Sequence, residues 1–294
     1  MQLSIPRPTV VTRPTAAKSR ARPVSAWDVF YATVLKELWT APKYKGNLIG
    51  TLIQLGIRML FFVLLSNIVA VRQTETFGRE LTGKELFIFF QGALLLFVFK
   101  GTALWTPLNA VTRDLSNGTL EYLYSNPCSR YAYYMGTVVS DIILSLPVFI
   151  PMYIALFIAS GADVGSMLMI LVVCVTIFFT LTAMGVMIGL LGLLWKQAMA
   201  MAGVIEICLE MLSGAYFPIA TFPVVLQYAA YVLPFTWGFD LIRYYSFSGD
   251  WVTLLPVWLE WLILGVFALA YTGVSRELLR RVERHAKQRG LHLL

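Results

Sequence analysis

The sequence is poor in charged residues. Only 13% of its 294 residues are Asp, Glu, Lys or Arg, against about 25% in a typical soluble domain, whereas 58% are hydrophobic. A soluble protein of this size has too small an interior to hide that much apolar surface from water. The composition therefore excludes a water-soluble domain and indicates an integral membrane protein.

Histidine and cysteine, which many catalytic and metal sites use, are also scarce. His285 and His292 both lie in the C-terminal tail, so no imidazole is available within the apolar part of the chain. Cys128, Cys174 and Cys208 are widely separated and fit neither a metal-binding nor a disulfide spacing. These absences argue against an intramembrane hydrolase and predict no metal site in this chain.

A functional phosphate-binding loop is missing as well. Residues 78–85 (GRELTGKE) have the spacing of such a loop, but Glu85 stands where a Ser or Thr would hold magnesium, and no strand precedes the segment. We therefore expect no cofactor in this chain, and any nucleotide energy has to come from another chain.

What the sequence does contain is long apolar runs, six of which suffice for a membrane-spanning helix of about 20 residues. None alternates apolar and polar residues as a barrel strand would. We therefore predict an all-α integral membrane protein with six transmembrane helices in one domain, residues 48–275. The predicted spans are approximately 48–71, 86–111, 132–159, 166–194, 197–214 and 252–275.

Basic residues gather at both ends of the chain. The first 47 residues hold eight Lys or Arg against two acidic residues, and the segment after residue 275 holds six against two. By the positive-inside rule both ends are cytoplasmic, which agrees with an even number of spans. The net charge of +7 then reflects topology and not nucleic-acid binding. We predict a multi-pass protein of the inner (plasma) membrane.

The ends differ from the spans in composition. Residues 1–24 predict a disordered basic arm, which contacts anionic lipid and is not a cleaved signal peptide. Residues 276–294 predict a basic cytoplasmic tail.

Residues 25–41 place aromatic side chains on one face, with Ser25 as N-cap. This pattern predicts an interfacial amphipathic helix on the inner leaflet. A helix packed on a soluble partner is the alternative.

Several ionisable residues fall within predicted spans, where each costs about 3 kcal/mol if unpaired. Glu206 and Glu210 share one helix face, and Arg58 lies at a similar depth. Lys100 and Asp141 also match in depth. Two interpretations stay open, namely ion pairs that fix helix packing and a polar path through the bundle. The residues concerned are Arg58, Lys100, Asp141, Glu206, Glu210 and Glu260.

Proline and glycine shape the later spans. Pro147 and Pro151 are expected to kink the third span. Gly185 and Gly189 form a G-x-x-x-G pair, for which packing within the chain is favoured over a contact between subunits. Residues 215–245 are too apolar for an external loop and too interrupted by proline to cross, so we predict re-entrant helices on the outer side, between the fifth and sixth spans.

A polar island, residues 113–130 (RDLSNGTLEYLYSNPCSR), separates the second and third spans. The charge bias places it in the cytoplasm, and residues 119–124 favour a short helix that ends before Pro127. Such a helix offers a docking surface at the cytoplasmic mouth of the bundle.

The polar island and the outer segment that begins at Ser213 resemble the corresponding regions in the permease subunits of ABC type 2 exporters. Gly118-Thr119-Leu120-Glu121, followed by Pro127, matches the glycine-threonine-leucine-glutamate stretch between the second and third spans of that family. Ser213-Gly214, with the later prolines and an arginine, matches its outer re-entrant region. The outer residues concerned, which would form a gate, are Gly214, Tyr216, Phe217, Pro218, Pro223, Pro234 and Arg243.

The resemblance implies a permease that dimerises, more readily as a homodimer than as a heterodimer. It also implies two cytoplasmic ABC ATPase subunits that bind ATP and magnesium. Their closure would push on the polar island, acting as a coupling helix. The residues that take this role by position are Arg113, Asp114, Gly118, Thr119, Leu120, Glu121 and Pro127.

Two parts of the sequence point to different transported molecules. The coupling loop resembles the drug and antibiotic efflux branch, whereas residues 43–50 (KYKGNLIG) resemble the entry of lipid-linked glycan exporters. Efflux of an amphipathic small molecule, drug or lipid is favoured over glycan export. A proton-coupled secondary carrier is the competing class, since intramembrane carboxylates can relay protons.

Overall fold

The computed structural model describes residues 25–41, 45–72, 82–116, 128–194 and 198–289. Within these ranges it has nine helices and no strand, so the all-α prediction is confirmed. The helices are α1 (Ala26–Thr40), α2 (Lys45–Arg72), α3 (Gly83–Ser116), α5 (Arg130–Ser160), α6 (Val164–Leu194), α7 (Ala198–Leu212), α8 (Val224–Tyr231), α9 (Pro234–Ser246) and α10 (Val257–Arg289), with a 3-10 turn at Ile219–Thr221.

Four helices have a described part that is long and apolar enough to cross a membrane: Gly83–Ala110, Arg130–Ser160, Val164–Leu190 and Val257–Arg281. In α2 the described apolar stretch is shorter, Gly56–Leu65, and α7 has 15 residues. The chain is thus a multi-pass membrane protein. Crossings by α2 and α7, which six spans require, stay a prediction.

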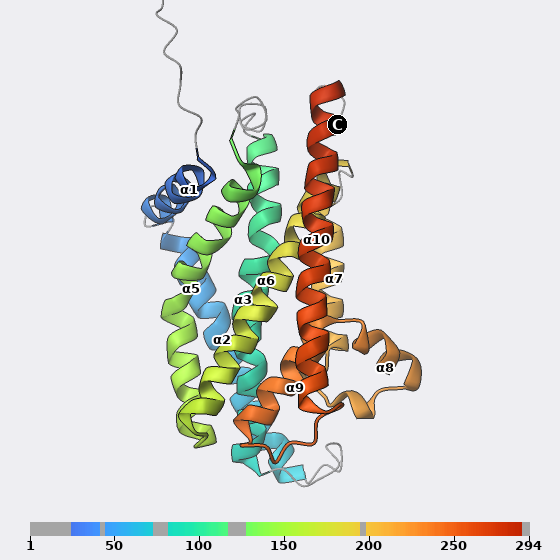
Figure 1. The fold of residues 1–294 in the computed structure, drawn as a ribbon. Coiled ribbons are helices and arrows are strands. Elements are labelled where there is room, and N and C mark those ends of the chain that lie inside the picture. The colour runs from blue at the N-terminus through green and yellow to red at the C-terminus, as the bar shows by residue number, and fades with distance from the viewer. Residues whose placement is uncertain (1–24, 42–44, 73–81, 117–127, 195–197, 290–294) are drawn as a thin grey trace, which may run out of the picture.

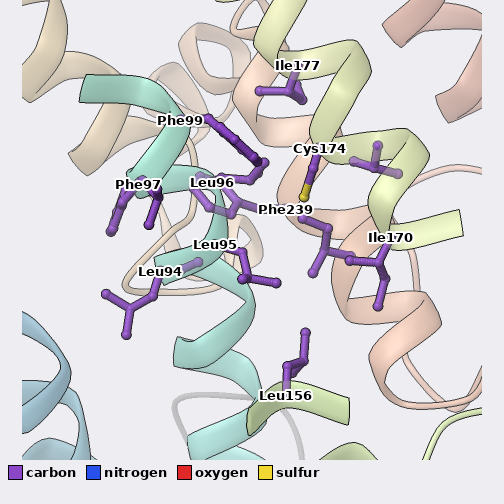
Figure 2. Packing of buried hydrophobic residues seen from close by; sticks show 14 of the residues in the cluster. Leu94, Leu95, Leu96, Phe97, Phe99, Leu156, Ile170, Cys174, Ile177 and Phe239 are labelled. Atoms are coloured by element: carbon purple, nitrogen blue, oxygen red, sulfur yellow. The ribbon is translucent and has the colours of Figure 1, made fainter. Parts of the chain in front are cut away.

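Helix α3 forms the centre of the bundle (Figure 1). Its side chains are buried almost all the way around from Leu86 to Lys100, as expected for a helix that is apolar on every face. Figure 2 shows side chains of α3 among those of three other helices. Those of α3 are Leu94, Leu95, Leu96, Phe97 and Phe99, and the others are Ile170, Cys174 and Ile177 on α6, Phe239 on α9 and Leu156 on α5. The central core therefore joins α3, α5, α6 and α9.

Helix α1 lies across the end of α5 (Figure 1). A capping box between Ser25 and Asp28 starts it. It can lie close to α5 because residue 136 is glycine: a Cβ there would come within 2.8 Å of the Thr33 Cβ. Its opposite face exposes Trp27 and Trp39, by 70% and 79%. Its packing partner within the described residues is α5, and the exposed tryptophans suit a membrane interface.

Both described ends of the chain lie at one end of the bundle (Figure 1). Helix α1 and the C-terminal part of α10 are there, whereas the turn between α5 and α6 and the start of α10 lie at the opposite end. Helix α10 begins at Val257, directly after Pro256 and five residues after the expected start of the sixth span. The shared position of the two ends agrees with an even number of crossings.

Candidate functional site

Four charged side chains of three helices meet inside the bundle. Arg58 Nη1 on α2 lies 2.8 Å from Glu210 Oε1 on α7, and Lys100 Nζ on α3 lies 3.0 Å from Glu206 Oε1. Lys100 also pairs with Glu210. We call these four residues the charge cluster. It contains two cations and two carboxylates, so its net charge is zero when all four are ionised.

Aromatic groups surround the charge cluster. The Phe97 ring lies beneath both cations, 5.2 Å from Arg58 Cζ and 5.1 Å from Lys100 Nζ. The Trp105 indole N–H donates to Glu206 Oε2 at 2.7 Å. Lys100 is only 2% exposed, and such burial is tolerated because every charge has a partner of opposite sign.

The matching depths predict only part of this arrangement. Arg58, which was matched by depth to Glu206 and Glu210, does meet Glu210. Lys100 and Asp141 were matched too, but Lys100 pairs with Glu206 and Glu210 instead. Asp141 on α5 accepts a hydrogen bond from the Thr106 hydroxyl. Depth places a residue along the membrane normal, and it does not say which helices are neighbours.

An open groove of about 330 Å³ lies beside the charge cluster. Arg58 forms part of its wall, and the Phe62 ring stacks on Phe90 at 4.9 Å between centroids. Its polar groups are an amide, a guanidinium and a phenol, and the rest of its lining is apolar. The residues that line it are Gln54, Ile57, Arg58, Phe61, Phe62 and Tyr216.

The segment after α7 is anchored by one arginine. Arg243 on α9 is 4% exposed, and its Nη2 donates to the carbonyl oxygens of Gly214 and Ala215 at 2.7 and 3.2 Å. Its guanidinium lies 3.6 Å from the centroid of the Phe89 ring. A cation at carbonyl groups just beyond the end of a helix is favourable, since it complements the helix dipole. Gly214 has φ +80°, which favours glycine.

The other outer residues shape turns. Pro218 and Pro223 precede the 3-10 turn and α8, and Pro234 is the first residue of α9, where its missing N–H costs nothing. Tyr216 lies near the rings of Phe62 and Phe97, at 5.8 and 6.0 Å, whereas Phe217 is 53% exposed. Two short helices with a sharp turn thus replace a span here.

The coupling residues expected in the polar island fall largely outside the described residues. Gly118, Thr119, Leu120, Glu121 and Pro127 all lie in the segment 117–127, which the structure does not describe. Arg113 and Asp114 belong to the last turns of α3, of which the backbone alone is described. The coupling role stays a prediction.

The sequence comparison identifies a family. The family model of the ABC-2 type transporter matches residues 27–247, three quarters of the chain. The chain belongs to the ABC-2 type transporter family. The resemblance seen in the sequence is therefore confirmed. A comparison with curated proteins finds no match.

Membership of the ABC-2 family makes this chain a membrane component of an ABC transporter, which associates with ABC ATPase partners. A membrane component of this kind is generally not catalytic itself. Within the described part of the chain, no three His, Cys, Asp or Glu side chains come together in a way that could hold a metal ion.

Two residues that take part in buried polar contacts, Trp105 and Asp240, were not among the predicted site residues. Trp105, which holds Glu206, gave no signal beyond its place in an apolar run. Asp240 on α9 did give a signal, because it is the only acidic residue in the apolar segment 215–245 and precedes Arg243 by one helical turn.

Proposed function

We propose that this ABC-2 protein is the permease subunit of an ATP-driven exporter. It forms a translocation path for an amphipathic small molecule, drug or lipid. The observation that supports this most directly is the charge cluster beside the open groove. Groups of opposite charge, partly accessible from an aromatic surface, can bind a molecule with both polar and apolar parts.

The charge balance of the cluster favours such a substrate over a lipid-linked glycan. A glycan attached to a lipid through phosphate brings negative charge into the path, and a free cation would be needed to bind it. Arg58 and Lys100 already face carboxylates, and Arg243 is turned toward backbone carbonyls. Glycan export remains the second candidate because of residues 43–50.

The same pairing disfavours a proton-coupled carrier. A carboxylate that relays protons has to become neutral during the cycle. Glu210 faces two cations and Glu206 faces Lys100, and removing a carboxylate charge would leave buried cations without partners. The energy source is therefore the hydrolysis of ATP, with its magnesium, on two separate ATPase subunits.

In the proposed assembly two copies of this permease form the path, and the two ATPases act from the cytoplasm. Residues 113–127 receive the force as a coupling helix, and segment 214–243 acts as the gate on the outer side. Residues 1–24, α1 and the basic tail contact membrane lipid. Both chain ends then lie in the cytoplasm, and the protein resides in the inner (plasma) membrane.

The first experiment reconstitutes the permease with its ABC ATPase, which we expect to be encoded beside its gene. It measures ATPase activity against hydrophobic drugs, phospholipids and lipid-linked glycans. We expect stimulation by uncharged or zwitterionic amphipathic molecules. Glu206→Gln should abolish this stimulation, and Glu277→Gln, at the exposed pair with Arg281, should leave it unchanged. Stimulation by glycans alone would favour the second candidate. Transport by the permease alone, driven by a proton gradient, would replace both.

The second experiment tests the coupling helix. Glu121→Ala and Gly118→Pro should each separate ATP hydrolysis from transport, because the first removes a docking charge and the second disturbs the turn that starts the helix. Size-exclusion chromatography should show an intact complex in both cases. Unchanged substrate-stimulated ATPase activity and transport would exclude a coupling role for this segment.

A further inference from the structure

Two carboxyl groups are buried side by side away from the charge cluster. Asp240 on α9 is 5% exposed and Glu260, in the first turn of α10, is fully buried. Helix α9 and the start of α10 lie toward the end of the bundle opposite α1 and the C-terminal part of α10 (Figure 1). The two carboxyl groups lie close together, because the N–H groups of the consecutive residues Leu254 and Leu255 donate to Asp240 Oδ2 and to Glu260 Oε1. Two ionised carboxylates this close in a buried site would repel each other, which favours one proton shared between them.

Three of the four carboxyl oxygens accept hydrogen bonds from the segment 251–255. The Trp251 indole N–H donates to Asp240 Oδ1 and the Leu254 N–H to Asp240 Oδ2, both at 2.7 Å. The Leu255 N–H donates to Glu260 Oε1 at 3.0 Å. The segment between α9 and α10 is therefore attached to the bundle through this pair of acids.

The fourth oxygen is where a shared proton would fit. Glu260 Oε2 is buried and receives no hydrogen bond from the residues that the structure describes. Asp240 accepts hydrogen bonds at both oxygens, from Trp251 and Leu254. A proton on Glu260 Oε2 satisfies that oxygen and donates to Asp240. This placement leaves one negative charge in the pair.

The neighbouring elements contain few groups that could compensate a second charge. On α9 the charged residues are Asp240 itself and Arg243, whose Nη2 is directed to carbonyl oxygens. Helix α6, which packs along α10, has Cys174 as its one titratable residue. Helix α3, which packs on α9, has Lys84, Glu85 and Lys100 as the charged residues among its described side chains, and Lys100 belongs to the charge cluster. Asp250 at the start of the connecting segment is exposed. A second ionisation would therefore place two negative charges in a buried site with one nearby cation.

We propose that Asp240 and Glu260 hold a single proton between them, and that this protonated pair fastens segment 251–255 to the start of α10. The attachment then responds to pH. Raising the pH removes the proton, the two carboxylates repel, and the segment detaches together with the N-terminal turn of α10. The proposal does not depend on the substrate or on the export function.

The test uses the full-length protein in proteoliposomes and two isosteric variants. Glu260→Gln mimics the protonated acid, because its amide can accept from Leu255 and donate to Asp240. In Asp240→Asn an NH₂ group replaces one of the two carboxyl oxygens. It then faces the Trp251 indole N–H or the Leu254 N–H, so one hydrogen bond to segment 251–255 is lost. We therefore expect near-normal thermal stability at pH 7 for Glu260→Gln and a lower unfolding temperature for Asp240→Asn, by about 5 °C. The opposite order, or equal losses, would overturn the assignment of the proton.

Two further measurements concern the proton itself. Infrared difference spectra at pH 7 should contain the C=O stretch of a protonated carboxyl that disappears in Glu260→Gln, and its absence from the wild type would refute the proposal. At alkaline pH, amide hydrogen exchange in segment 251–255 should be about tenfold faster in the wild type than in Glu260→Gln. Equal exchange in the two proteins would show that the pair does not hold the segment.

Discussion

Lys100 on α3 lies between two glutamates of α7, with its Nζ 3.0 Å from Glu206 Oε1 and also paired with Glu210. Glu210 in turn is shared with Arg58 on α2. One buried cation therefore holds two successive turns of α7, and one carboxylate joins α2 to α3. The short helix α7, with 15 residues, is attached to the bundle by these ion pairs and by the buried side chains of Ala202 and Leu209.

Loss of Lys100 should be the most damaging single change in the charge cluster. Lys100→Met leaves Glu206 without its cation, and breaking a buried pair in this way costs about 3–5 kcal/mol. Arg58→Gln should cost less, because the Arg58 side chain is 28% exposed and Glu210 keeps Lys100. Unfolding of the detergent-solubilised protein measures both changes. Equal effects would contradict the central position of Lys100.

The Arg58–Glu210 pair should be coupled energetically. Arg58→Gln and Glu210→Gln each break the same contact, so the double variant should lose less stability than the sum of the two single variants, by about 1–3 kcal/mol. A double-mutant cycle on unfolding free energies gives this coupling. Strict additivity would mean that the contact contributes nothing.

Gly185 should not tolerate a methyl group. A Cβ there would lie 2.5 Å from the Ala103 carbonyl oxygen and 2.8 Å from that of Leu104, so α6 and α3 would have to separate. Gly185→Ala should destabilise the protein by about 1–3 kcal/mol. Gly203→Ala on α7 is the matched control, since no atom lies within 4 Å of its added Cβ. This close approach to α3 confirms that Gly185 packs within the chain. A stable Gly185→Ala protein would contradict it.

Arg243 should resist replacement even by lysine. Lysine can reach a carbonyl oxygen, but it lacks the planar guanidinium that lies on Phe89 while Nη2 holds Gly214 and Ala215. Arg243→Lys should lower the free energy of unfolding by about 2 kcal/mol or more. Arg281→Lys, at an exposed i,i+4 pair, should have almost no effect. Similar values for the two would argue against the anchoring role.

Asp163, in the turn before α6, should make stability depend on pH. The Ser166 hydroxyl donates to its Oδ1 at 2.6 Å, and with the N–H groups of Ser166 and Gly165 it lowers the pKa of Asp163 below the usual value. A lowered pKa in the folded state means that the stabilisation is present above the pKa of the unfolded chain and is lost as the pH falls through the folded value. Asp163→Asn should remove this acid dependence from thermal unfolding curves. An unchanged curve would show that the cap contributes nothing.

Much of the fold could be predicted from residue patterns. Apolar length predicts α3, α5, α6 and α10, and the proline spacing predicts that residues 215–245 do not form a span. The i,i+4 spacing of Glu206 and Glu210 predicts that they share a face of α7, where both meet Lys100. These features depend on local geometry, which a sequence specifies directly.

The partners across helices could not be predicted. Lys100 matches Asp141 in depth, yet it pairs with α7, because the way α3 packs between its neighbours decides which helix lies opposite each of its faces. Asp240 and Glu260 are 20 residues apart and meet only because the chain turns back between α9 and α10.

By itself the sequence determined that this chain is an all-helical membrane protein with the motifs of an ABC-2 permease, because apolar length, charge bias and proline positions act locally or along the membrane normal. Only the tertiary structure decided which buried charges neutralise one another and which two carboxyl groups come to lie side by side. Those outcomes depend on the lateral arrangement of helices. That arrangement has to bring opposite charges together, because an unpaired buried charge strongly destabilises the fold.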